Sequence, residues 1–173
     1  MVIIVIIAGC TTKNNTIPVI ENKLSTLDPS EMALQLSDLP EGYVMVYSGS
    51  LNLGNNSEGL NAKKQFIVEF QKGTTPNTFI NQVILVFPID QINKTIPYIS
   101  SGSLKISTTK QLSNPNIGDS SFAIRAVNSL RGGDIYIIYF VKKDVFEVIE
   151  MEGSVTDYET LKQLATTAAA KIK

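Results

Sequence analysis

The 173-residue chain has a formal net charge of −1, and charged residues make up 18% of it, below the roughly 25% of an average protein. It contains no histidine, no tryptophan and one cysteine, Cys10. These counts exclude a disulfide within the chain, Ser-His-Asp and Cys-His catalysis, and zinc sites built from His and Cys. The weak charge also argues against a nucleic-acid partner, because phosphate backbones bind clustered Lys and Arg.

The first ten residues combine an apolar run with a short motif. Residues 2–7 are apolar and β-branched, and the run ends in Ile7-Ala8-Gly9-Cys10, which resembles a prokaryotic lipobox. The resemblance implies cleavage before Cys10 and a diacylglycerol on its sulfur, whose two acyl chains anchor stably. No Lys or Arg precedes Cys10, so we expect a translation start upstream. The alternative is a buried strand at 2–7 with a buried thiol.

The next segment, 11–27, is typical of a flexible spacer, because it is rich in Thr, Asn and Lys without a hydrophobic period. We therefore expect a truncated signal peptide (1–9), a lipidated Cys with its tether (10–27) and one globular domain (28–173). Three N-x-S/T sequons occur, and those at Asn14 and Asn55 lie in expected loops where an exported chain can be glycosylated.

The first half of the domain is expected to hold two helices and three strands. Asp28 can cap a short helix, with Pro29 in its first turn and Glu31 completing a capping box. Alternating apolar residues predict a strand at 64–71. The inward residues of the first helix are expected to be Met32, Ala33, Leu36 and Leu39. The further elements expected are strands at 43–51 and 83–87 and a helix at 88–96.

The second half is expected to repeat this plan with a longer final helix. Thr156-x-x-Glu159 reads as a capping box, and acidic and basic residues at the two ends suit the helix dipole. The core stripe of this helix is Tyr158, Leu161, Leu164, Ala165, Ala168 and Ile172. The strands expected before it are 104–112, which is weak, 122–127, 135–141 and 145–151.

These elements predict a fold of the α+β class, in the order α-βββ-α-(β)βββ-α. Short turns between strands force antiparallel pairing. Helices that bury an apolar stripe must then pack on the sheet. We therefore expect an antiparallel sheet of about six strands packed with helices in a layered sandwich.

Few residues are candidates for chemistry. Glu147, Glu150 and Glu152 lie on or near one strand, where paired acids can bind calcium or act as acid and base, or simply form a solvated edge. Arg125 can pair with Asp119 or a Glu as structural glue, or contact an anionic ligand. No nucleotide-binding motif occurs. We therefore assign no catalytic, cofactor-binding or metal-binding residue and expect no cofactor.

Three stretches support a family resemblance beyond the lipobox: 36–43 (LSDLPEGY), 117–122 (IGDSSF) and the closing hairpin with its Ala-rich helix. On these the chain resembles uncharacterised archaeal and bacterial lipoproteins with a tethered α+β domain, over most of 30–173. The element order is also similar to PsbP-like sandwiches and to extracellular sensor domains of bacterial kinases. The resemblance implies an exported protein, lipid-anchored at the extracytoplasmic face of a membrane, and carries over no functional residue except Cys10.

The expected function is a non-enzymatic binding, sensing or protein-interaction module, tethered to the membrane through Cys10. Its ligand would be a small molecule, a lipid or a protein. Two alternatives stay open. A hydrolase that works with carboxylates alone needs two acids facing each other across a pocket, and a structural envelope component needs contacts between copies.

Overall fold

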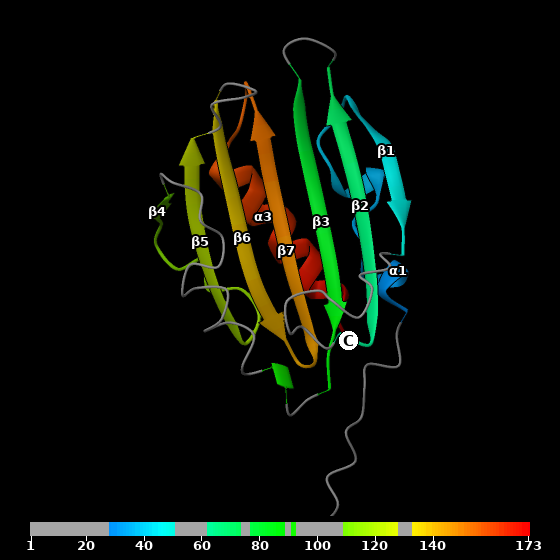
Figure 1. Ribbon diagram of the computed structural model, residues 1–173. Helices are drawn as coiled ribbons and strands as arrows, with labels where there is room; N and C mark the ends of the chain where they lie inside the picture. Colours follow the sequence, from blue (N-terminus) through cyan, green and yellow to red (C-terminus); the bar gives the residue numbers. More distant parts are fainter. Residues whose placement is uncertain (1–27, 51–61, 74–76, 89–90, 93–108, 128–132) are drawn as a thin grey trace, which may run out of the picture.

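Seven antiparallel strands form one sheet in the order β1-β2-β3-β7-β6-β5-β4 (Figure 1). The computed structural model describes residues 28–50, 62–73, 77–88, 91–92, 109–127 and 133–173. The β3–β7 pair joins the two halves of the sheet, with nine residues of each strand in register. The strands are β1 (Tyr43–Gly49), β2 (Lys64–Lys72), β3 (Thr78–Val86), β4 (Thr109–Gln111), β5 (Ser120–Val127), β6 (Asp134–Lys142) and β7 (Val145–Gly153).

The helices α1 (Pro29–Met32) and α3 (Tyr158–Lys171) and the 3-10 turn η1 (Leu36–Asp38) lie on one face of this sheet. The longest is α3, which packs on β6 and β7. The one-turn helix α1 contacts β2, β3 and α3, and η1 follows it. The chain between α1 and β1 therefore lies on the same side as α3, behind the sheet in Figure 1.

The expectation of an α+β layered sandwich with flanking helices was wrong. The described chain is mostly one seven-stranded sheet, and its two α-helices have four and fourteen residues. The first helix ends early because Ala33 is extended, with ψ 145°, and the Leu34 N–H binds the side chain of Gln82 instead of continuing the helix. Leu36, expected inward, is 48% exposed. The helix expected at 88–96 lies mostly outside the described residues.

Strand β3 is longer than the sequence predicted, which adds to the share of sheet in the fold. It begins at Thr78, where the sequence predicted a strand only from residue 83. Polar Asn81 and Gln82 interrupt the apolar run, but they are paired with β2 on one side and β7 on the other. A central strand satisfies its backbone hydrogen bonds through both neighbours, so polar side chains do not end it.

The core stripe of α3 is confirmed, but its cap is not the expected one. Asp157, rather than Thr156, is the N-cap, and its carboxylate accepts from the Thr160 N–H at 2.9 Å and the Glu159 N–H at 3.4 Å. At α1, the Asp28 carboxylate accepts from the N–H of Ser30, two residues later, instead of from the N–H of Glu31 as the expected capping box requires. The stripe residues that are buried are Leu161, Leu164, Ala165, Ala168 and Ile172.

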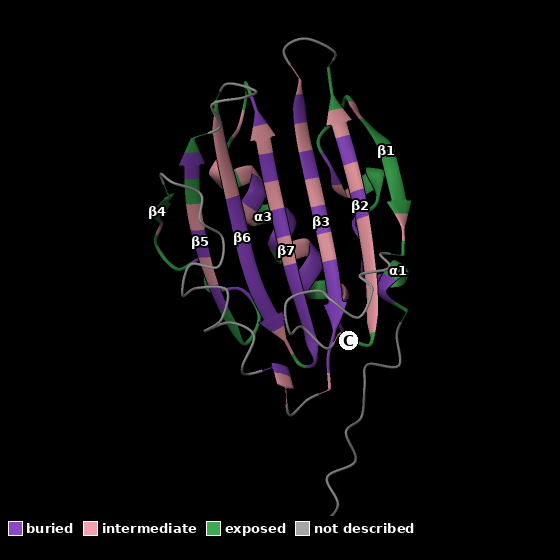
Figure 2. Ribbon diagram, viewed as in Figure 1, coloured by how far each residue is buried: buried purple, intermediate pink, exposed green. Residues whose placement is uncertain are grey.

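Alternation along the strands gives the sheet two apolar faces (Figure 2). The α3-side core lies between the sheet and the helices, and it includes Phe70, Ile84, Phe140 and Ile149. The opposite-face core is built from Leu85, Phe87, Ile92, Ile137, Tyr139, Val141 and Phe146. Both faces are buried over Ile137–Val141 of β6, whereas β7 alternates between buried and intermediate residues after Glu147 (Figure 2).

Candidate functional site

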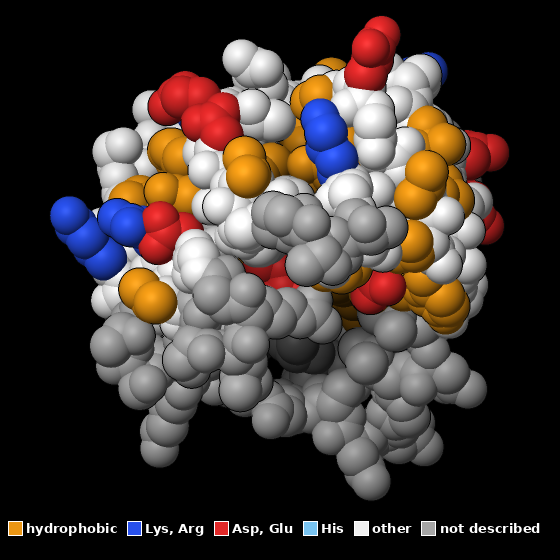
Figure 3. Space-filling model, turned by 90° about the horizontal axis from the view of Figure 1, so that it is seen from above, with side chains coloured by type: hydrophobic (Ala, Val, Ile, Leu, Met, Phe, Trp, Pro, Cys, Tyr) orange, Lys and Arg blue, Asp and Glu red, His pale blue; other side chains and the backbone are white. Residues whose placement is uncertain are grey.

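A cleft of about 430 Å³ opens at the end of the sheet where β2 and β7 finish and β1 and β3 begin. This volume lies within the roughly 300–1,000 Å³ of small-molecule sites. Figure 3 looks down on this end of the sheet, where single acidic and basic side chains stand among apolar ones. The lining residues are Pro40, Tyr43, Lys72, Gly73, Thr78, Met151, Val155, Asp157 and Thr160.

The walls of the cleft are largely apolar. Met151 is 2% exposed at the end of β7, and Val155, in the turn before α3, is 72% exposed. Pro40 and Tyr43 come from the segment that enters β1. Gly73 continues β2 with φ 76°, a left-handed conformation that favours glycine and lets the chain turn beside the cleft. The arrangement can bury an apolar ligand body between β1 and the start of α3.

Most polar groups of the cleft are engaged within the protein. The Thr78 hydroxyl donates to the Val155 carbonyl at 3.0 Å. The Asp157 carboxylate accepts from the hydroxyl of Thr160 at 2.6 Å and from the first amides of α3, and these hydrogen bonds lower its pKa. Its negative charge is therefore partly balanced by the positive end of the helix dipole.

Lys72 is the cation of this cleft. Its ammonium lies 5.6 Å from the centroid of the Tyr43 ring, within the range of a cation–π contact. Burial raises the pKa of the Tyr43 hydroxyl, so this side chain stays a neutral phenol near pH 7. A cation held beside an aromatic ring can receive a carboxylate or phosphate group, because charge-assisted hydrogen bonds are the stronger ones.

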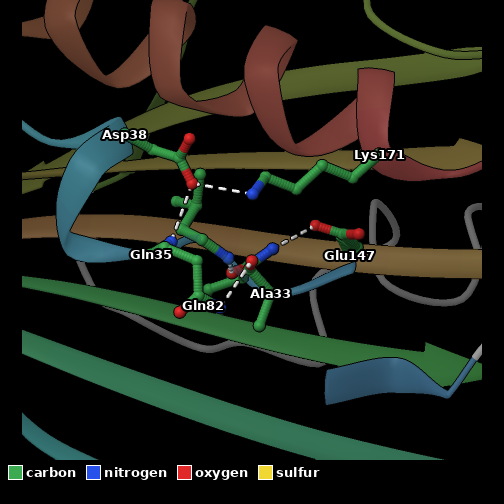
Figure 4. A network of polar contacts seen from close by, with 7 residues as sticks. Ala33, Gln35, Asp38, Gln82, Glu147 and Lys171 are labelled. Atoms are coloured by element: carbon green, nitrogen blue, oxygen red, sulfur yellow. Dashed lines mark hydrogen bonds and ion pairs between the residues drawn. The ribbon is translucent and has the colours of Figure 1, made fainter. Parts of the chain in front are cut away.

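A second polar feature lies inside the α3-side core (Figure 4). Glu147 and Gln82 are both fully buried, and Gln82 Nε2 donates to Glu147 Oε2 at 2.7 Å. The Leu34 N–H donates to Gln82 Oε1 at 2.7 Å. Burial raises the pKa of Glu147 to about 8, although the Gln82 hydrogen bond and the charge of Lys171 act in the opposite direction. Glu147 Oε1 has no hydrogen-bond partner among the described residues.

The three acids that the sequence placed on one strand do not form one site. Glu147 points into the α3-side core, while Glu150 and Glu152 belong to the opposite face of β7. They therefore do not face one another across a pocket. Among the described residues, no group of three or more Asp, Glu or Cys side chains is arranged to hold a metal ion.

The other residues singled out from the sequence lie away from the cleft. Arg125 forms an ion pair with Asp134 at 2.7 Å and lies over the Tyr136 ring, 6.0 Å from its centroid. It does not pair with Asp119, whose carboxylate accepts from the Lys143 N–H. A ligand contact by Arg125 stays a prediction. Cys10, Asn14 and Asn55 lie outside the described residues.

Comparison of the chain with protein-family models, curated proteins and solved structures finds no match. None of the described helices combines the length and hydrophobicity needed to cross a membrane.

Sequence reasoning missed every residue of the cleft as a functional candidate. Lys72 and Gly73 lie directly after the strand expected at 64–71 and were given no role, and Tyr43 was only the start of the strand expected at 43–51. The lining residues come from segments far apart in the chain, and nothing in any one segment marks a site. The single local signal was Asp157 at the start of a capped helix, where helix amides gather.

Proposed function

We propose that the chain is a non-enzymatic binding module that takes a small molecule with an apolar body and an anionic group into the cleft. The observation that supports this most is Lys72, a cation set beside the Tyr43 ring in a cleft with apolar walls. Small-molecule sites are commonly apolar with a few polar groups that fix orientation. Met151 and Pro40 would contact the apolar body while Lys72 binds the anionic group.

Nuclear magnetic resonance titration with phenylacetate and phenethylamine tests this proposal, because the two probes share an aromatic body and carry opposite charges. Phenylacetate is expected to give saturable shifts at the amides of Gly73 and Thr78, and phenethylamine is not. Lys72→Met should weaken phenylacetate at least tenfold. Lys110→Met, which removes an exposed cation from β4 at the other edge of the sheet, should leave binding unchanged. Saturable binding of phenethylamine alone, or of neither probe, would contradict the proposal.

We also infer that a lipid on Cys10 holds the module at the extracytoplasmic face of a membrane. The lipobox resemblance, the polar spacer at 11–27 and the absence of a second cysteine support this. Mass spectrometry of the native protein is expected to find a diacylglycerol on Cys10 and no residues before it. An intact Met1 with a free thiol would contradict the anchor without affecting the cleft.

One alternative, a structural envelope component, is favoured by the edge strand β1. Four neighbouring residues of β1 are exposed by 38–58%, and the strand carries no charge. Edge strands usually carry charges or Lys that prevent pairing with another chain. Copies that associate through β1 should form disulfide-linked dimers in membranes when Val46→Cys is oxidised, and Lys110→Cys on β4 should not. Absence of the Val46→Cys dimer would remove this alternative. The exposed residues are Val44, Met45, Val46 and Tyr47.

A further inference from the structure

The chain between α1 and β1 contains a strap, residues 33–39, that crosses the α3 side of the sheet without being part of it. Its contacts are deep, since Leu34 is fully buried and Leu39 is 9% exposed. Two side chains of the main body hold it. Gln82 Oε1 accepts from the Leu34 N–H at 2.7 Å, and Lys171 Nζ forms an ion pair with Asp38 at 2.8 Å. Figure 4 shows the ion pair between Lys171 and Asp38, and the hydrogen bond between Gln82 and Glu147.

The first attachment depends on Glu147, which lies under the strap. Gln82 can offer its oxygen to Leu34 because its NH₂ group donates to Glu147 Oε2. A side-chain amide has one acceptor end and one donor end, so the partner at each end fixes its orientation. Glu147, Gln82 and Leu34 therefore form a continuous chain of hydrogen bonds from β7 to the strap.

The surroundings of Glu147 are poor in charge. Its cross-strand neighbours are Ile84 on β3 and Phe140 on β6, and β3 adds only the neutral Gln82. From α3, Lys171 acts on the carboxyl, and its ammonium pairs with Asp38 of η1.

Two further cations lie near the end of α3: Lys173, which is exposed, and Lys142 of β6. Lys142 Nζ donates to the Ala169 carbonyl at 2.6 Å, so it is held at the end of the helix. Lys171 is thus the cation that can form an ion pair with an ionised Glu147, but its ammonium is already paired with Asp38.

The protonated and ionised forms of Glu147 differ sharply in this setting. A neutral carboxyl keeps the Gln82 hydrogen bond and leaves one unpartnered oxygen. A buried carboxylate needs a cation or water, because an ion in an apolar interior is strongly destabilised. Strands β3 and β6 flank Glu147 in the sheet ladder, whereas the strap is attached to the main body by the Leu34–Gln82 hydrogen bond and the Asp38–Lys171 ion pair.

We propose that Glu147 is a proton-operated latch for the strap. With the carboxyl protonated, Gln82 holds Leu34 and Lys171 holds Asp38, so the strap stays docked. When the carboxyl releases its proton to solvent, the carboxylate draws Lys171 away from Asp38 and admits water, and the strap detaches. The raised pKa of Glu147 agrees with a docked state that prefers the proton.

Release of the strap also changes the cleft, because the residues that follow the strap line one wall of it. Leu39 continues directly into Pro40, and Tyr43 follows at the start of β1; both Pro40 and Tyr43 line the cleft. A detached strap removes this wall, so ligand affinity should fall as the latch opens. This last step rests on the proposed function, while the movement of the strap does not.

Hydrogen exchange of the full chain without ligand tests the latch. Between the ordinary pKa of a glutamate and about 8, linkage predicts that each pH unit favours the undocked strap by up to tenfold, with a plateau above that range. After correction for intrinsic exchange, protection of the Leu34 and Asp38 amides should fall at least tenfold from pH 6 to pH 8. In Glu147→Gln it should change less than twofold.

Glu69→Gln is the matched control, because Glu69 lies on β2 next to the core residue Phe70 but faces away from α3. It should behave like the natural chain. Equal pH dependence in Glu147→Gln and the natural chain would overturn the latch. Protection that does not change with pH in the natural chain would do the same.

A carbon-13 titration of the Glu147 carboxyl gives a test that needs no variant. Its midpoint is expected near 8. A midpoint below 5 would overturn the latch even if Glu147→Gln did not fold. If the strap responds to pH but phenylacetate does not bind, the proposed function fails and the latch stands. If phenylacetate binds and its binding depends on Lys72, but the strap is insensitive to pH, the latch fails and the proposed function stands.

Discussion

Each of the two cores of the sheet contains a buried ionisable side chain, Glu147 or Tyr139, and the two respond differently to pH. On the α3 side, Glu147 keeps one hydrogen bond, to Gln82. On the opposite face, Tyr139 is 2% exposed, stacks on Phe122 with centroids 4.5 Å apart, and its hydroxyl has no partner among the described residues. Burial raises the pKa of both groups.

The difference lies in where each pKa starts. A glutamate normally titrates well below neutral pH, so a raised pKa brings Glu147 into the physiological range. A tyrosine normally titrates near 10, so the same change keeps Tyr139 neutral at every pH that the fold meets. Burial therefore makes Glu147 sensitive to pH near neutrality and leaves Tyr139 insensitive there.

The largest expected effect comes from Glu147→Gln. Because the folded-state pKa is raised from 4.5 to about 8, the contribution of Glu147 to stability is greatest below pH 4.5 and is lost as the pH rises to 8. At about 1.4 kcal/mol per pKa unit, this loss is at most roughly 5 kcal/mol. Urea unfolding of Glu147→Gln should show a nearly constant free energy of unfolding from pH 4.5 to 8.5. A curve parallel to that of the natural chain would show that Glu147 is not the source.

Phe140→Ala and Phe146→Ala compare the two faces directly. Both side chains are fully or almost fully buried, and each truncation should cost about 3–5 kcal/mol in the free energy of unfolding. Phe140 is the cross-strand neighbour of Glu147, so its cavity lets water approach the carboxyl and should reduce the dependence of stability on pH. Phe146→Ala should leave that dependence unchanged. If the free energy of unfolding depended on pH equally in both variants, the two faces would not differ in their response to pH.

Asp157→Ala weakens the helix that covers the α3 side. Loss of the N-cap should cost about 1 kcal/mol, because the first amides of α3 lose their acceptor. Thr156→Ala removes the residue that the sequence pattern had suggested as the cap, and it should cost less than about 0.5 kcal/mol. Thermal unfolding of the two variants at one pH gives the comparison. A larger loss for Thr156→Ala would place the cap at Thr156.

The smallest effect is expected for Tyr139→Phe. Removing a buried hydroxyl without a partner should be neutral or stabilising by up to about 1 kcal/mol, at every pH between 5 and 9. Tyr47→Phe, at an exposed residue, is the control and should be neutral. Urea unfolding at both pH limits measures this. A destabilisation above 1 kcal/mol would show that the hydroxyl has a partner, and the contrast between the faces would then be weaker.

Local periodicity explains which parts of the fold were predictable. Phe66, Val68 and Phe70 alternate, and all three face the α3-side core in β2. The stripe of α3 was equally visible, since its residues recur at helical spacing. Such patterns report which side of an element is buried, and they do not report how many strands join one sheet or where a helix is broken by a distant contact.

The strap shows what a pattern cannot contain. Its path is set by the bond from Leu34 to Gln82, which is 48 residues away, and Gln82 is oriented by Glu147, a further 65 residues along. Each of these polar residues looks like an ordinary solvated side chain in the sequence. Helical spacing from Met32 predicted that Leu36 faces inward. The backbone is extended at Ala33 and Gln35, so Leu36 does not continue the face of α1 and is exposed.

The cleft was out of reach of the sequence for the same reason. Tyr43, Lys72 and Asp157 meet only after β1, β2, β3 and β7 have formed the sheet and α3 has packed on it. A turn containing Lys and Gly is common in any protein, so Lys72-Gly73 carries no chemical signal of its own.

The ends of β2 have a consequence for access. Asp28, where the described chain begins, acts electrostatically on Lys64 at the start of β2, while Lys72 at its other end lines the cleft. The eight steps from Lys64 to Lys72, at about 3.3 Å each, separate the two ends of β2 by roughly 26 Å. In Figure 1, α1 accordingly lies near the bottom of the sheet, and the ends of β2 and β7 at the top. The described chain thus begins at the end of the sheet opposite the mouth of the cleft, so a tether that joins the domain at Asp28 would not have to pass the mouth.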